Sequence, residues 1–152
     1  MPRDQSLRLV VPGTVDYLDR IRAFVGDAAG GCGFATETVD EIVLALDEAV
    51  ANVVEHAYEG SDLPELERTI ELIVESNQDG IRFRLRDHGQ PFDPGGAAEV
   101  DLDTHLASGS QDGLGIHLMR RLMDRISWRP LPSGNELILE KNRLFDREDR
   151  LP

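Results

Sequence analysis

The hydrophobic positions of this chain switch between two spacings, which predicts strands and helices in a defined order. Residues 7–11 alternate between apolar and polar as in a strand, and Pro12-Gly13 marks a turn. From Thr14 to about Ala29 the apolar residues recur at helical spacing, and two glycines follow. This first segment therefore predicts a short strand, a turn and an amphipathic helix.

A second helical pattern begins near Thr36 to Thr38 and runs to about Tyr58. Thr38 and Glu41 have the spacing of a capping box, in which two side chains satisfy the free backbone donors at a helix start. The apolar residues of this segment form a stripe, so we expect one face of the helix to pack against a sheet.

The rest of the chain predicts four more strands and a third helix. The strands cover 69–75, 81–87, 126–129 and 136–140, and the helix runs from Leu114 to about Met123. Turns are expected at 77–80 and at 132–135. The long stretch from His88 to about Asp112 is typical of a functional lid or of disorder.

The resulting order, β-α-α-β-β-lid-α-β-β, predicts an α+β fold. Strands and helices that do not strictly alternate favour a two-layer sandwich, with helices on one face of a mixed, largely antiparallel sheet. The 152 residues fit one domain, for which we expect residues 1–145, with the lid at about 88–113 and a charged tail at 146–152.

Composition narrows the class of protein. With 40% hydrophobic and 30% charged residues, the chain is typical of soluble globular proteins. No apolar run approaches the roughly 20 residues that span a bilayer, and residues 1–6 contain no apolar signal core. Cys32 is the only cysteine, so no internal disulfide is possible. We expect a cytoplasmic protein.

The net charge of −13 restricts the ligands. Such a field repels phosphate backbones, and the basic residues are scattered and flanked by acids, so no basic patch for nucleic acid is expected. A bound nucleotide would need a counter-cation, for which Mg²⁺ is the candidate. The acidity also suits docking onto a basic protein, and it is equally compatible with solubility alone.

Glu48 and Asn52 are four residues apart in the second predicted helix, so their side chains share one face. A carboxylate beside an amide oxygen can bind Mg²⁺ together with water and phosphate, and the carboxylate can instead act as a base. The alternative is a pair of solvated polar residues. Asn is a poor helix former, and its place among Ala and Val favours a functional reason.

Asp87 ends a predicted strand and is followed by Gly89. A carboxylate there can accept a hydrogen bond from the exocyclic amine of adenine, while guanine presents a carbonyl instead. The glycine would let the base lie against the backbone. The alternative is an ordinary Asp-x-Gly turn.

Residues 109–115 contain three glycines and precede the third helix. Backbone N–H groups at a helix start can bind phosphate, although flexible caps use the same residues. The Gly-x-x-x-x-Gly-Lys pattern of P-loops is absent.

Taken together, three segments resemble the N, G1 and G2 boxes of the GHKL ATPases. They are residues 47–58 (DEAVANVVEHAY), 87–93 (DHGQPFD) and 113–124 (GLGIHLMRRLMD). Within these ATPases, the chain looks like the bacterial anti-sigma-factor serine/threonine kinases of partner-switching systems, over about Leu7 to Lys141. It departs from the usual Asp-x-Gly-x-Gly of the G1 box at Gln90-Pro91, and Glu55 in the N box favours the serine-kinase branch over the histidine kinases.

The resemblance implies a Bergerat fold and assigns roles within it. Glu48 would be the catalytic base, Asn52 the Mg²⁺ ligand and Asp87 the adenine-binding carboxylate. The remaining residues that it places at the ATP are Gly89, Phe92, Gly113, Leu114 and Gly115, the glycines at 113 and 115 contacting phosphate.

The resemblance also implies protein partners. Members bind a sigma factor or similar target, phosphorylate a small antagonist of the STAS fold on serine or threonine, and commonly form homodimers. We expect the partner surface near the first helix, with Arg20 and Arg22. The alternatives are a nucleotide-gated binding module without phosphotransfer, and a catalytic domain that acts on a histidine of another chain.

Overall fold

The computed structural model describes residues 5–90 and 111–143. Residues 1–4, 91–110 and 144–152 lie outside the described part, and with them most of the expected lid and the whole expected tail. The strands are β1 (Gln5–Pro12), β2 (Thr69–Ser76), β3 (Gly80–Asp87), β4 (Arg125–Leu131) and β5 (Gly134–Asn142). The helices are α1 (Leu18–Gly31), α2 (Thr36–Asn52) and α4 (Gln111–Leu122), with short 3-10 turns at Val15–Tyr17 and Glu65–Glu67.

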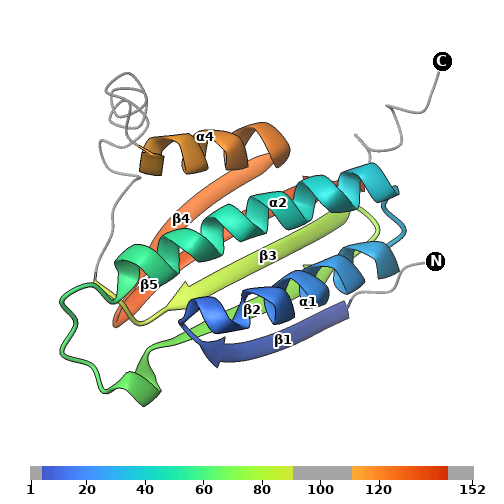
Figure 1. The fold of residues 1–152 in the computed structure, drawn as a ribbon. Helices are drawn as coiled ribbons and strands as arrows, with labels where there is room; N and C mark the ends of the chain where they lie inside the picture. Colours follow the sequence, from blue (N-terminus) through green and yellow to red (C-terminus); the bar gives the residue numbers. More distant parts are fainter. Residues whose placement is uncertain (1–4, 91–110, 144–152) are drawn as a thin grey trace.

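The five strands form one sheet in the order β1-β2-β3-β5-β4, and each described pairing is antiparallel. The predicted α+β sandwich is therefore confirmed, with an antiparallel sheet where the sequence left room for a mixed one. In the register of β3 and β5, Asp87 lies opposite Asn135. This pairing brings the end of one strand and the beginning of the other to the same edge of the molecule (Figure 1).

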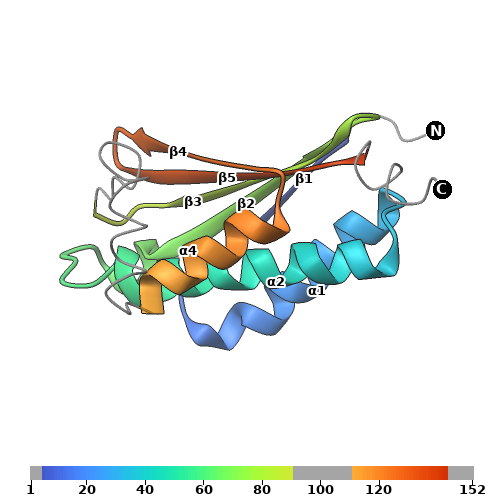
Figure 2. The ribbon, with the colours of Figure 1, turned by 90° about the horizontal axis from the view of Figure 1, so that it is seen from above.

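All three helices lie on one face of the sheet, with α2 between α1 and α4 (Figures 1 and 2). Alternate residues of β2 and β3 are buried under them because strand side chains point to opposite faces in turn. The interface is apolar and contains fully buried side chains such as Val25, Ile42, Leu46, Phe83 and Leu139. Burial of this core holds α2 in a fixed position over the sheet.

The second helix begins earlier than its capping-box spacing predicts. Ala35 is the N-cap residue and makes no side-chain cap; the first helical bond runs from the amide of Val39 to the Ala35 carbonyl at 2.9 Å. Thr38 therefore lies inside the first turn, where it is buried in the core. The predicted capping box is wrong because the apolar packing of this turn takes Thr38 inward.

The last turn is also shorter than predicted. The sequence indicates a turn over residues 132–135, yet Gly134 and Asn135 already belong to β5. A side chain at Gly134 would begin 1.9 Å from the Asp87 carbonyl oxygen, so only glycine lets the strand pair this closely. The turn is thus reduced to Pro132-Ser133, and Asn135 lies at the start of β5, opposite Asp87.

Within the described part of the chain, the face of the sheet without helices contains six arginines, from β1, β3 and β4. Their carboxylate partners are four glutamates, and together they span all five strands: Arg8–Glu71–Arg86–Glu136–Arg84–Glu75–Arg82–Glu140–Arg125, with Arg129 also on Glu136. Strand pairing brings these arginines together from different strands, and glutamates lie between them. Each is paired with an acid, as the sequence suggested.

Candidate functional site

The candidate site lies at one end of the molecule, where α2 ends, β3 ends and α4 begins (Figure 1, left). Glu48 and Asn52 are on one side of α2, and both side chains are half-buried. Gly115 of α4 faces them: a methyl group there would lie 3.0 Å from Glu48 Oε2 and 3.8 Å from both Asn52 side-chain polar atoms. The structure therefore brings together three residues that the sequence singled out.

Asn52 is at a change of helix type. It is the last residue of α2, and the chain continues as a π-helical turn, Val53–Ala57. Such turns are rare in proteins, and those that occur are often at functional sites. The sequence predicts one helix to about Tyr58, with Asn52 as a poor helix former in its middle; in the structure Asn52 instead lies at the boundary between two helical geometries.

Asp87 occupies the buried end of β3, with 5% of its surface exposed. Its Oδ1 accepts hydrogen bonds from the Gly89 amide at 2.8 Å and from Asn135 Nδ2 at 3.1 Å. Burial raises the pKa of Asp87, because the charged form loses water, and the two hydrogen bonds only partly offset that rise. The carboxylate is therefore oriented and partly desolvated, as a recognition group needs to be.

The residues after Asp87 are fixed to the end of the π turn. A methyl group at Gly89 would lie 2.1 Å from the Ala57 carbonyl oxygen, so glycine is needed for this approach. The Gln90 amide donates to the same carbonyl at 3.0 Å, and its side chain donates to the Glu59 carbonyl. These bonds hold residues 88–90 against the end of the π turn that follows Asn52, although Gln90 stands where the G1 box departs from its usual pattern.

Tyr58 ties the same turn to β2. Its hydroxyl accepts from the His88 amide at 2.9 Å and donates to the Thr69 carbonyl at 2.5 Å. Burial raises the pKa of the Tyr58 hydroxyl, which keeps it protonated and able to donate. Sequence reasoning missed this role and that of Asn135, since both depend on contacts between segments distant in sequence.

Other predicted site residues are described only in part. Phe92 lies outside the described residues. Helix α4 begins three residues earlier than the sequence predicts, so Gly113 and Leu114 belong to its first turn. Only the backbone of this turn is described. The predicted phosphate-binding glycines are thus helical rather than ahead of the helix.

The donor set fits a magnesium nucleotide better than a metal held by protein alone. Within residues 5–90 and 111–143, no three His, Cys, Asp or Glu side chains gather as metal ligands would. Glu48 and Asn52 offer hard oxygen donors at the point where Gly115 leaves room. A divalent ion there would complete its coordination shell with phosphate and water.

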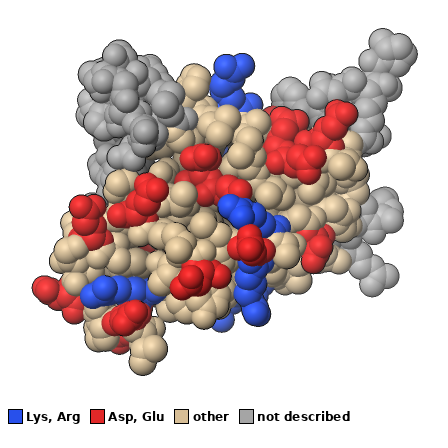
Figure 3. All heavy atoms as spheres, in the orientation of Figure 1, with Lys and Arg blue, Asp and Glu red and all other residues tan. Residues whose placement is uncertain are grey.

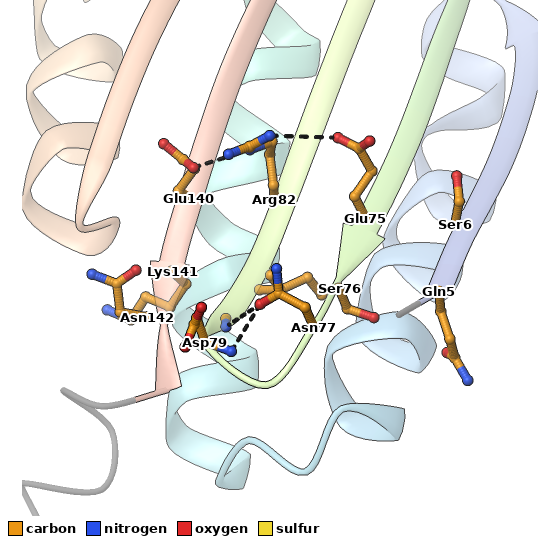
Figure 4. A pocket seen from close by; sticks show the side chains of 12 residues that line it. Gln5, Ser6, Glu75, Ser76, Asn77, Asp79, Arg82, Glu140, Lys141 and Asn142 are labelled. Atoms are coloured by element: carbon orange, nitrogen blue, oxygen red, sulfur yellow. Dashed lines mark hydrogen bonds and ion pairs between the residues drawn. The ribbon is translucent and has the colours of Figure 1, made fainter. Parts of the chain in front are cut away.

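A separate open hollow of about 490 Å³ lies at the opposite end of the sheet, around the β2–β3 turn (Figure 4). Its cations are already engaged. Arg82 pairs with Glu140 at 3.0 Å and Glu75 at 3.9 Å, and Lys141 donates to the Leu122 carbonyl at 2.7 Å. This hollow therefore offers no ready anion site.

The expected partner surface on the first helix is partly occupied by internal pairs. Arg22 bonds to Asp47 at 2.8 Å and to Asp19 at 2.8 Å, and these carboxylates raise its pKa. Arg20 is exposed. Acidic side chains are spread over this helical face (Figure 3). None of the helices in the described part is both long and apolar enough to cross a bilayer.

Comparison with known proteins gives a consistent assignment. Residues 11–141 match the family described as "Histidine kinase-like ATPase domain". A serine-protein kinase RsbW from Bacillus cereus is 27% identical over 130 residues, covering 83% of this chain and 78% of the relative. A serine-protein kinase RsbW from Bacillus pumilus is 29% identical over 125 residues, covering 79% and 75%.

A solved structure also shares the fold. The RsbU and RsbW domains of a Mycobacterium tuberculosis protein align with a TM-score of 0.62 at 16% identity. The alignment covers 90% of this chain and 31% of that longer chain, and at this identity it bears on the fold alone. Because the family match extends over residues 11–141, the chain belongs to the histidine kinase-like ATPase domain family.

Proposed function

We propose that the protein is an ATP-dependent protein serine/threonine kinase that also sequesters a regulatory protein in a partner-switching system. The observation that carries the proposal is the Glu48 carboxylate, which lies beside Asn52 and faces the backbone of Gly115. The proposed base and the proposed metal ligand thus lie beside Gly115, in the helix that we propose to bind the phosphates. The relatives named serine-protein kinase support the same reaction.

Glu48 is the proposed catalytic base. Its carboxylate takes the proton of the acceptor serine or threonine hydroxyl as that oxygen forms a bond to the γ-phosphorus of ATP. The bond from that phosphorus to the β–γ bridging oxygen breaks, and its electron pair leaves with ADP.

Asn52 is the proposed ligand of Mg²⁺, which would neutralise phosphate charge and hold the phosphates in line when bound. On a chain of net charge −13, this compensation matters for binding any nucleotide. Gly113, Leu114 and Gly115 would contact the phosphates through the start of α4.

Asp87 is the proposed reader of adenine, with Gly89 allowing the base to approach and Phe92 lining the same site. A carboxylate accepts from the 6-amino group of adenine and repels the 6-carbonyl of guanine. The proposed domain is residues 1–145, with a lid at about 88–113.

The proposed partners are a STAS-type antagonist, which receives the phosphate, and a sigma factor or similar target, which is sequestered. A homodimer is proposed by analogy with such kinases. Of the two arginines expected on the first helix, Arg20 is the better candidate for partner contact, because Arg22 is engaged by two aspartates.

The test is affinity capture from lysate of the source cell, with and without Mg-ATP, followed by intact-mass measurement of each partner. A small partner that gains one phosphoryl mass only with Mg-ATP is the expected substrate. With that partner purified, Glu48→Gln should slow transfer by roughly a hundredfold or more. Glu41→Gln, on the same helix two turns earlier, is the matched control and should leave the rate unchanged.

Two results would count against the proposal. Transfer by Glu48→Gln at the parent rate would remove Glu48 as the base. A partner captured by the ATP-bound protein but never phosphorylated would instead support a nucleotide-gated binding module.

A further inference from the structure

Asn135 occupies a position in the candidate site that its sequence neighbours do not reveal. It is the second residue of β5, lies opposite Asp87 and is 5% exposed. One side-chain nitrogen makes two described bonds, to Asp87 Oδ1 at 3.1 Å and to the Gln90 carbonyl at 2.7 Å. Both protons of this amide nitrogen are thereby used on the two segments that frame the proposed base site.

The bonds to Asp87 are one-sided. Among the described residues, the donors to Asp87 are the Gly89 amide and Asn135 Nδ2, and both bond to Oδ1; we therefore assign Oδ2 to a ligand amine. A carboxylate rotates easily about its last torsion, so its direction is set by such bonds. Asn135 is the only side chain among the described residues that bonds to this carboxylate, since the other donor is backbone.

We propose that Asn135 is a specificity-determining positioning residue, which fixes the Asp87 carboxylate so that the site accepts 6-amino purines and rejects 6-oxo purines. The inference rests on the proposed nucleotide function. It does not make Asn135 a catalytic residue, because it acts through Asp87.

The physical reason lies in what Asp87 would do without this donor. A carboxylate that is free to turn can direct either oxygen away from the base, which weakens the bond to the amine. Loss of a donor to the charged form also favours protonation, and burial already acts in that direction. A protonated carboxyl group can donate to the 6-carbonyl of guanine. Discrimination would therefore fall because adenine binds more weakly and guanine binds more tightly.

The choice of amide matters because it supplies two donors from one atom. A serine hydroxyl has one proton and can satisfy either Asp87 or the Gln90 carbonyl, whereas leucine has a similar shape and no donor. The substitutions Asn135→Leu and Asn135→Ser therefore form a graded series. Asn142→Leu, at the other end of the same strand, is the matched control because it is exposed and remote from Asp87.

The experiment measures the affinities of the full-length parent and variants for ATP and GTP, each with Mg²⁺, by calorimetric titration. Phosphate and sugar contacts are common to both nucleotides, so the ratio of the two dissociation constants isolates reading of the base. We expect the parent to prefer ATP, Asn135→Leu to lose about tenfold of that preference, and Asn135→Ser to fall between them. Asn142→Leu should keep the parent ratio.

The outcomes separate this inference from the function on which it rests. An unchanged ATP-to-GTP ratio in Asn135→Leu, with lower stability in urea, would overturn it and leave Asn135 a structural brace. If that variant does not fold, an unchanged ratio in Asn135→Ser has the same meaning. A parent that binds both nucleotides equally overturns the inference and the adenine-reading role of Asp87 but leaves the proposed kinase reaction standing, whereas a parent that binds neither nucleotide overturns the proposed function as well.

Discussion

Asp87 links the proposed base recognition to pH. The carboxylate must be ionised to accept from adenine, and its pKa is raised, chiefly by burial. We therefore predict that nucleotide affinity falls as the pH is lowered from neutral, beginning above the value near 3.9 that is ordinary for aspartate. Calorimetric titration of ADP at a series of pH values measures the fall.

Asp87→Asn serves as the background for this measurement, since an amide does not titrate while the phosphates of the nucleotide still do. The difference between parent and variant should vanish at low pH and grow toward neutral pH. Parallel curves would contradict the assignment. In the unliganded protein the sign is opposite: an acid with a raised folded pKa makes the fold more stable as the pH falls.

The candidate residues differ in how far local sequence could predict them. Glu48 and Asn52 share a helix face because of their spacing alone, and Asp87 ends a strand whose alternation is clear. Asn135 could not be identified in this way. Its importance arises from a strand register that no local pattern records.

At the scale of elements, the joint between the π turn and the end of β3 is the most constrained contact of the site. Gly89→Ala would place a methyl group 2.1 Å from the Ala57 carbonyl oxygen and 2.7 Å from its Cβ. Gly89 has no positive φ, so the cost comes from this contact and not from backbone strain. We predict a loss of about 1–3 kcal/mol of unfolding free energy, together with weaker nucleotide binding.

Urea unfolding and nucleotide titration check this prediction. Gly30→Ala is the control, because no atom outside its own helix lies within 4 Å of the added methyl group. That control should match the parent or gain slightly, as alanine favours a helix. Parent-like stability and binding in Gly89→Ala would show that the joint can relax, and that glycine is not required there.

Element order and type were predictable because hydrophobic periodicity survives in almost every segment, as in β2 and β3 with their alternate buried residues. The residues at which the elements begin and end were less predictable. The π turn has no local signal; it forms where the Ala57 carbonyl accepts from Gln90, 33 positions later in the chain. The two-residue turn before β5 likewise depends on the approach of Gly134 to Asp87.

At the scale of the whole molecule, the strand order of the sheet determines which charged side chains lie next to one another. Arginines from three strands, β1, β3 and β4, meet on the face without helices, where four glutamates from β2 and β5 separate them. Glu136 is the centre of this network, fully buried beneath Arg84, Arg86 and Arg129. The sequence shows the alternating charges of single strands but not their convergence, which requires the strand order.

Glu136 should therefore be the residue through which this face affects stability. Burial alone would raise its pKa, but the hydrogen bond from Arg86 and the charges of all three arginines outweigh it, so the pKa is lowered. A lowered folded pKa gives stability that is complete above the unfolded value, about 4.3, and is lost as the pH falls through the folded pKa. Replacing the carboxylate leaves three guanidinium groups without their shared partner.

We predict that Glu136→Gln lowers the unfolding free energy by about 3 kcal/mol at neutral pH, and that this deficit shrinks as the solution is acidified. Urea unfolding at a series of pH values between neutral and about 3 measures both effects. Glu65→Gln, exposed in a 3-10 turn away from the sheet, should change neither. Stability of Glu136→Gln equal to the parent at every pH would mean that the buried ion pairs do no more than balance their own desolvation.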